Sequence, residues 1–284
     1  DGFLCASMSN SKFVTVDGVK PHSLEAGQSD GRPTVLLLHS AEFGGAAELS
    51  WEFNIGPLGE HFHVLAPDHL GFGRTDKVFD FCGQFDRRIE HIRRFLEVMD
   101  VHDVYVIGSS MSGGLSLTVA CRDKPDWPMR KVISCSGGGL SPANDARAVL
   151  NSYEGDFEHM RRIVEVMFVD PKWAGDDAYI ARRQELAQLP GAWEATAAAR
   201  FRAPFREAAG KSEREQLDHG NIKIPALIIA GSKDPLRLPG YADELVAEIP
   251  GGKLYTFENA GHMGNIECAD EFNREVIAFL KEDP

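Results

Sequence analysis

Ser110, Asp234 and His262 are the residue types that together perform nucleophilic catalysis, and each of them follows an apolar run of the sequence. Ser110 follows VYVIGS, Asp234 follows ALIIAGSK, and His262 follows KLYTFENAG. A serine hydroxyl becomes a nucleophile when an imidazole takes its proton, and a carboxylate holds that imidazole in the correct orientation. If the three runs are strands of one parallel sheet, their carboxyl ends meet at one edge, so we predict a Ser–His–Asp triad there.

Each of these residues also has an ordinary structural explanation. Gly–Ser turns are common after strands, Asp234 in SKDP can stabilise a turn or a helix start, and His262 is one of ten histidines. However, the sequence offers no other acid directly after a late strand, because the run KVISCS is followed by no carboxylate before Asp145. The joint occurrence of the three residue types therefore favours the catalytic interpretation.

The segment GSSMSGG, residues 108–114, is expected to hold the nucleophile. Gly108 and Ser112 lie two residues before and after Ser110, and both are small, as a tight strand-to-helix turn requires. A nucleophile at such a turn adopts a strained backbone with a positive φ. The N–H of Met111, at the start of the next helix, would then face the oxyanion that forms during attack.

Strand and helix patterns alternate along the chain and predict the framework for these residues. Most of the expected strands are continuously apolar, as in a parallel sheet covered on both faces, and helical spacing predicts helices at 85–99 and 272–280. The predicted fold is an α/β fold with a mostly parallel central sheet, built from residues 1–140 and 222–284. Residues 141–221 show no strand pattern and are expected to form an inserted helical cap. The expected strands are 13–16, 34–39, 63–68, 104–109, 131–136, 226–232 and 253–258.

The composition excludes several classes of partner. The chain has 284 residues and a net charge of -13 without a basic stripe, which argues against nucleic acid and anionic membranes as partners. No apolar run approaches the roughly 18 residues of a membrane span. Five scattered cysteines without a CxxC motif predict reduced thiols in a cytoplasmic protein. No residue cluster predicts a metal or another cofactor.

In its motifs the chain resembles the α/β-hydrolases, and more narrowly the meta-cleavage-product hydrolases. The resemblance is carried by HFHVLAPDHLGFGRTDK (61–77), the turn around Ser110, the segment SGGGLSP that leads into the predicted cap, and AGHMGNIECADEFNREVIAFL (260–280). The order Ser, Asp, His along the chain is also that of the α/β-hydrolases. The resemblance implies hydrolysis of a carbon–carbon bond in 2-hydroxy-6-oxo-hexa-2,4-dienoates, which form by ring opening of catechols, with ketonisation before the bond breaks.

The resemblance further implies that Arg183 pairs with the substrate carboxylate. Periodicity gives independent support, because on the helix predicted at 176–189 Arg183 lies near the centre of the apolar stripe, whereas Arg182 points to one side. The alternative is an arginine at the edge of the cap, or one paired with Glu185 or Glu207.

This chain departs from the family around the expected substrate pocket. Where the family carries a glycine-rich stretch after the strand at 34–39, this chain has Ser40, Ala41 and Glu42, of which Ala41 can still donate its N–H. The expected oxyanion donors are therefore Ala41 and Met111. We call residues 40–42 the oxyanion loop. The expected pocket includes Arg183, Ser109, which replaces an asparagine of the family, and Met263, which replaces a tryptophan. Three residues that follow the oxyanion loop complete it: Phe43, Trp51 and Asn54.

These changes spare the triad, so we expect the chemistry to be retained and the substrate to have changed. The expected activity is that of a serine-dependent hydrolase acting on a small molecule with a carboxylate and an apolar arm, with Ser110 either forming an acyl-enzyme or activating a water. A carboxylesterase or lactonase would need the same triad without ketonisation or a carboxylate clamp. A ligand receptor on a hydrolase scaffold would need only the pocket, and a homodimer is left open.

Overall fold

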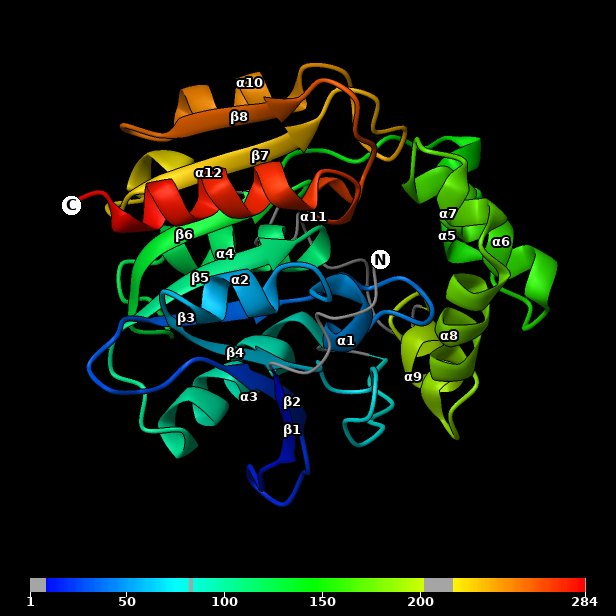
Figure 1. The fold of residues 1–284 in the computed structure, drawn as a ribbon, viewed down its shortest axis with the longest axis horizontal. Helices are drawn as coiled ribbons and strands as arrows, with labels where there is room; N and C mark the ends of the chain where they lie inside the picture. The colour runs from blue at the N-terminus through cyan, green and yellow to red at the C-terminus, as the bar shows by residue number, and fades with distance from the viewer. Residues whose placement is uncertain (1–8, 82–83, 202–216, 284) are drawn as a thin grey trace.

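An eight-stranded sheet forms the centre of the protein (Figure 1), in the order β1-β2-β4-β3-β5-β6-β7-β8. The structure is a computed structural model that describes residues 9–81, 84–201 and 217–283. β1 and β2 pair antiparallel with their neighbours, and every other neighbouring pair is parallel. The strands are β1 (Asn10–Phe13), β2 (His22–Ala26), β3 (Thr34–Leu38), β4 (His63–Pro67), β5 (Val104–Ser109), β6 (Met129–Cys135), β7 (Ala226–Gly231) and β8 (Lys253–Phe257).

Two layers of helices cover the sheet. On one face Leu36 and Leu38 of β3 pack into a cluster with α3, α4 and α10, and on the other face Val35 and Leu37 pack with α1, α2 and α12. Successive residues of a strand point to opposite faces, so a strand covered on both sides must be apolar on both, as β3 is from Val35 to Leu38. These helices are α1 (Ala47–Ser50), α2 (Ile55–Gly59), α3 (Gln84–Val98), α4 (Met111–Cys121), α10 (Tyr241–Glu248) and α12 (Ala269–Lys281), with the short α11 (Gly264–Glu267) before α12.

The insertion between β6 and β7 is helical, and in Figure 1 its helices lie beyond the ends toward which the arrows of β7 and β8 point. Their apolar side chains form a third cluster with Phe43 and Met263 from loops, Leu49 of α1 and Ile266 of α11. The last part of the predicted cap, 202–216, lies outside the described residues. The helices are α5 (Asp145–Asn151), α6 (Phe157–Met167), α7 (Lys172–Gly175), α8 (Asp177–Ala187) and α9 (Ala192–Ala198), followed after the gap by the turn η3 (His219–Asn221).

The predicted fold class is confirmed, and the sequence-based boundaries fail mainly at one edge of the sheet. The strand expected at 13–16 is wrong, because β1 ends at Phe13, and β2 was not predicted. Both strands carry polar side chains and are partly exposed, so they lack the apolar run that marks the buried strands. None of the helices in the described ranges has the length and apolar character that a membrane crossing needs.

Candidate active site

Ser110, Asp234 and His262 meet at the carboxyl edge of the sheet, after β5, β7 and β8 respectively. The Nε2 atom of His262 lies 2.7 Å from the Ser110 hydroxyl oxygen, and its Nδ1 lies 2.7 Å from Asp234 Oδ2. The side chains of His262 and Asp234 are buried, whereas Ser110 remains partly exposed. This is the geometry in which an imidazole takes a proton from a serine hydroxyl.

Asp234 is held in its ionised form. Burial would raise the pKa of its carboxyl group, but the charge of His262 and the hydrogen bond from His262 outweigh burial and lower it. The Leu236 N–H also donates to Asp234 Oδ1, at 2.8 Å. A carboxylate in this position accepts the Nδ1 proton of His262 and leaves Nε2 to act as the base toward Ser110.

The turn around Ser110 has the strain expected of a nucleophile. Ser110 has a φ of 54°, and its N–H donates to Cys135 O of the neighbouring strand at 2.7 Å. A Cβ on Gly108 would lie 2.3 Å from the carbonyl oxygen of Ser112, and one on Gly113 would lie 2.4 Å from Ser134 Oγ. The close approach of strand and helix therefore requires glycine at 108 and 113.

Ser112, which stands where the usual motif has its second glycine, joins the turn to the loop after β3. Its hydroxyl donates to His39 O at 2.5 Å and accepts from His69 Nε2 at 2.7 Å. His69 N in turn donates to His39 Nε2 at 2.9 Å. Burial lowers the pKa of both histidines, so both are neutral and serve as structural hydrogen-bonding groups. The sequence analysis did not single out His69.

The two expected oxyanion donors are available. In the described part of the chain, neither the Ala41 N–H nor the Met111 N–H donates a hydrogen bond to another residue. Met111 is the first residue of α4, where an N–H has no partner within the helix. Neither N–H group is therefore committed to another acceptor among the described residues, as an oxyanion donor requires.

Arg183 is fully buried and pairs with a residue that the sequence analysis did not consider. Its Nη1 donates to Glu42 Oε1 at 2.9 Å and its Nε donates to Tyr179 OH at 3.0 Å. Burial would raise the pKa of Glu42, but the charge of Arg183 outweighs it and lowers that pKa. Glu185 does not pair with Arg183, and Glu207 lies outside the described residues. The arginine expected to hold a substrate carboxylate thus already holds one from the oxyanion loop.

One donor of Arg183 remains open, and the neighbouring Arg182 behaves as expected. Among the described residues, Arg183 Nη2 has no hydrogen-bond partner although it is buried. Arg182 points away and pairs with Glu52 at the surface.

Three further residues of the expected pocket lie at the interface between the cap helices and the sheet edge, or directly beside the nucleophile. Phe43 and Met263 belong to the apolar cluster of the cap helices, with the Phe43 ring centroid 5.3 Å from that of Tyr153. Ser109 is buried, and its hydroxyl has no partner among the described residues.

Trp51 and Asn54, the last two residues of the expected pocket, both contact the C-terminal helices. Trp51 packs on Phe272 in the cluster between the sheet and α12. Asn54 Nδ2 donates to Asn265 O at 3.0 Å and to Asn273 Oδ1 at 2.9 Å. Trp51 thus links the end of α1 to α12, and Asn54 links the start of α2 to α11 and α12, contacts that the sequence pattern did not reveal.

Glu267 holds the catalytic loop against the cap, a role that the sequence analysis missed. Its carboxylate accepts from Gly261 N and Val169 N, each at 2.7 Å, and from Asp170 N at 3.0 Å. The His262 N–H donates to Met167 O at 2.9 Å. The loop that carries the base is therefore fixed to the end of α6, and no local sequence pattern marks such a long-range contact.

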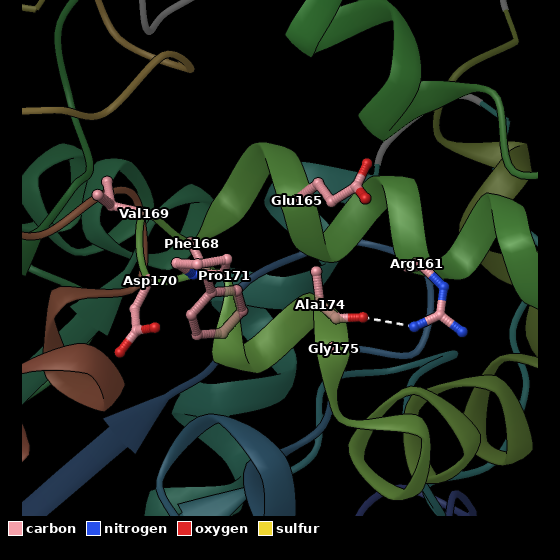
Figure 2. Close-up of a pocket in the computed structure, with 8 residues that line it drawn as sticks. All are labelled: Arg161, Glu165, Phe168, Val169, Asp170, Pro171, Ala174 and Gly175. Atoms are coloured by element: carbon pink, nitrogen blue, oxygen red, sulfur yellow. Dashed lines mark hydrogen bonds between the residues drawn. The ribbon is translucent and has the colours of Figure 1, made fainter.

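Two other features of the cap do not belong to the triad. A pocket of about 400 Å³ lies between α6 and α7, and none of its lining residues is an expected site residue. Figure 2 shows these residues, among which Arg161 donates to Ala174 O. Within the described ranges, Glu154, Asp156 and His159 could together approach a metal ion. Asp156, however, caps α6 by accepting from His159 N at 2.7 Å, so this group has a structural explanation.

Comparison with known proteins agrees with this geometry. Residues 35–275 match the model of the alpha/beta hydrolase family. The chain is 28% identical, over 95% of its length and 90% of the relative, to the 2-hydroxy-6-oxo-6-(2'-aminophenyl)hexa-2,4-dienoic acid hydrolase of Metapseudomonas resinovorans. It is 26% identical, over 87% of both chains, to the 2-hydroxymuconate semialdehyde hydrolase of Pseudomonas sp. strain CF600.

A solved structure shows the same fold. The meta-cleavage product hydrolase from Pseudomonas fluorescens IP01 superposes with a TM-score of 0.81, over 95% of this chain and 97% of that chain, at 23% identity. The matched family model, the shared fold and the Ser–His–Asp geometry lead to one conclusion: this chain belongs to the alpha/beta hydrolase family and is a serine hydrolase.

Proposed function

We propose that the protein hydrolyses a carbon–carbon bond beside a ketone in a ring-opened aromatic product of the 2-hydroxy-6-oxo-hexa-2,4-dienoate type. The observation that carries this proposal is the direct contact of Ser110 with His262, and of His262 with Asp234, in a chain whose relatives are named as hydrolases of such compounds. Hydrolysis adds one water: the acyl carbon gains a hydroxyl group and the leaving carbon gains a hydrogen.

The residues have distinct roles in this reaction. Ser110 attacks the ketone carbon while His262 takes its proton, and the N–H groups of Ala41 and Met111 bind the resulting oxyanion. The carbon–carbon bond then breaks, and its electron pair passes into the rest of the substrate, which can accept it once the enol has become a second ketone. His262 returns the proton to the leaving carbon, and a water activated by the same base releases the acyl group.

The proposed pocket is formed by residues beside the nucleophile. Arg183 contributes a hydrogen bond through its open Nη2, whereas Glu42 already compensates its charge. Ser109 contributes its unpartnered hydroxyl, and Phe43 and Met263 contribute apolar surface.

The test follows the yellow dienoate chromophore in the presence of purified enzyme. The wild type should remove the absorbance, and Ser110→Ala should lower kcat by about 10⁴-fold or more. Ser29→Ala, at an exposed position, should behave as the wild type. A wild type that leaves the dienoate intact contradicts carbon–carbon cleavage.

An esterase or lactonase is the second candidate, and the Glu42–Arg183 pair favours it specifically. A compensated arginine offers little attraction to the carboxylate that a dienoate substrate carries. Turnover of a p-nitrophenyl ester without dienoate cleavage would support this candidate.

Domain division, location and assembly complete the proposal. We propose that residues 141–221 form a cap domain on a core domain made of residues 1–140 and 222–284. We also propose that the protein is cytoplasmic. Of the described cysteines, Cys135 and Cys268 are free thiols, as in a reducing compartment. Light scattering tests for a homodimer, which would have twice the mass of the chain.

A further inference from the structure

Most described arginines pair with an acid, but several close to the active site do not. Within the described ranges Arg88, Arg147, Arg162, Arg200 and Arg237 form no ion pair, whereas arginines at the surface such as Arg93, Arg130 and Arg182 do. Arg162 is exposed and needs no partner, but Arg88 is only 7% exposed. Arg88 and Arg200 stand out because each contacts one of the two residues expected to donate to the oxyanion.

Arg88 reaches the active site from α3. Its Nη1 lies 3.7 Å from Met111 Sδ, directly beside the nucleophile. Its Nη2 donates to Gln84 Oε1 at 2.8 Å, and the guanidinium carbon lies 5.3 Å from the ring centroid of Phe72. These contacts are neutral, and the acid whose charge acts on Arg88, Asp80, forms its ion pair with Arg87 instead.

Arg200 reaches the oxyanion loop from the end of α9. Its Nη2 donates to Ala41 O at 3.1 Å, and its guanidinium carbon lies 4.7 Å from the ring centroid of Phe43. Its other hydrogen bonds go to Thr196 O and Asn151 Oδ1, which are also neutral. The acid that acts on it, Glu42, is already hydrogen-bonded to Arg183.

The region therefore carries more positive than negative charge, in a chain whose net charge is -13. Burial lowers the pKa of Arg88 to about 10, helped by the charge of Arg200, and burial likewise lowers the pKa of Arg200 to about 10. Both groups remain charged at neutral pH. Arg88 is buried and Arg200 is half-buried, and a buried cation without an ion-pair partner is unfavourable and is often found at functional sites.

We propose that Arg88 and Arg200 form the anion subsite of the active site and bind a carboxylate group of the acyl substrate, beside the oxyanion loop. This proposal rests on the proposed serine hydrolase activity, but not on the bond that is cleaved. Arg183 is less suited to this role because Glu42 already compensates its charge. Guanidinium groups bind carboxylates through paired, charge-assisted hydrogen bonds, and two of them beside one carbonyl would select a substrate that bears an acid group.

The test compares two esters of the same chain length that differ in one charge: mono-p-nitrophenyl glutarate and p-nitrophenyl pentanoate. The measured quantity is the ratio of kcat/KM for the charged ester to that for the uncharged one. Arg88→Met and Arg200→Met should each lower this ratio about 10- to 100-fold, mainly through KM, because each removes a charge-assisted hydrogen bond. Arg88→Lys and Arg200→Lys should recover part of the loss.

The matched control is Arg162→Met, which removes an exposed arginine without an ion-pair partner and should leave the ratio unchanged. The melting temperature gives a second readout, since removal of an arginine with a purely structural role would lower it. Here Arg88→Met should melt at or above the wild-type temperature, because it removes a buried, uncompensated charge. A large fall in melting temperature together with an unchanged ratio would show a structural role and overturn the proposal.

Two outcomes separate this proposal from the proposed carbon–carbon hydrolysis. If the wild type hydrolyses both esters but not the dienoate, the carbon–carbon proposal fails while the ratio still tests the subsite. If the ratio is unchanged in Arg88→Met and Arg200→Met but falls in the double variant Glu42→Gln/Arg183→Met, anion recognition belongs to Arg183 and the subsite proposal is overturned.

Discussion

The buried pair of Glu42 and Arg183 gives the sharpest prediction about stability. Arg183→Met leaves the Glu42 carboxylate buried, with 3% of its side chain exposed, and without its counter-ion. Breaking a buried pair in this way costs about 3–5 kcal/mol. For a chain of this size, that corresponds to a fall in melting temperature on the order of 5–8 °C. The pair joins α8 to the oxyanion loop, so its loss should also disturb the position of that loop in the active site.

Thermal unfolding at pH 7 tests this prediction, with Arg182→Met as the control. Arg182 lies next in sequence on the same helix, but its pair with Glu52 is largely exposed, so its loss should cost about 1 kcal/mol or less. The double variant Glu42→Gln/Arg183→Met should recover much of the stability, because no charge is then left unpaired. If Arg183→Met melts as Arg182→Met does, the pair does not hold the loop and the reasoning fails.

Other perturbations test the triad, the nucleophile turn and the charge of the loop. Asp234→Asn should lower kcat by about 10⁴-fold with little change in melting temperature, since it presents His262 in the wrong tautomer; normal turnover would contradict the triad. Ser112→Gly removes two buried hydrogen bonds and should lower the free energy of unfolding by about 1–3 kcal/mol in urea titrations, whereas equal stability would show that the bonds are dispensable. Gly108→Ala places a Cβ 2.3 Å from a backbone oxygen and should abolish activity or folding. The control is Gly175→Ala, which has open space around it and should be tolerated in the same expression and activity assays. The folded-state pKa of Glu42 is lowered from 4.5, so its stabilising contribution is present above that value and is lost as pH falls through the folded pKa; melting curves from pH 7 downward should therefore fall more steeply for the wild type than for Glu42→Gln.

The sequence predicted those parts of the site whose signal is local. β5 spans Val104–Ser109, as expected, because a continuous apolar run followed by small residues has few other interpretations. The apolar stripe of α8 correctly indicated that Arg183 is buried. Its partner was not predictable in this way, because Glu42 lies 141 residues away along the chain and comes from an irregular loop. The contacts of Trp51 and Asn54 with the C-terminal helices were not predictable for the same reason, since those helices lie more than 200 residues further along the chain.

The altered oxyanion loop connects the stability of the site to its specificity. Glu42 is buried in this loop, and a carboxylate can be buried there only if a cation accompanies it. Arg183 supplies that cation, so a single acidic residue converts a group suited to binding substrate into one that anchors the loop. The positive charge available to an anionic substrate then comes from Arg88, which contacts Met111, and Arg200, which contacts Ala41. Neither arginine forms an ion pair with an acid among the described residues. On this reasoning Glu42→Gln should raise the kcat/KM of the charged ester relative to the uncharged one, because it frees the charge of Arg183 to act alongside the other two. An unchanged ratio in that variant would mean that the loop carboxylate does not influence substrate charge.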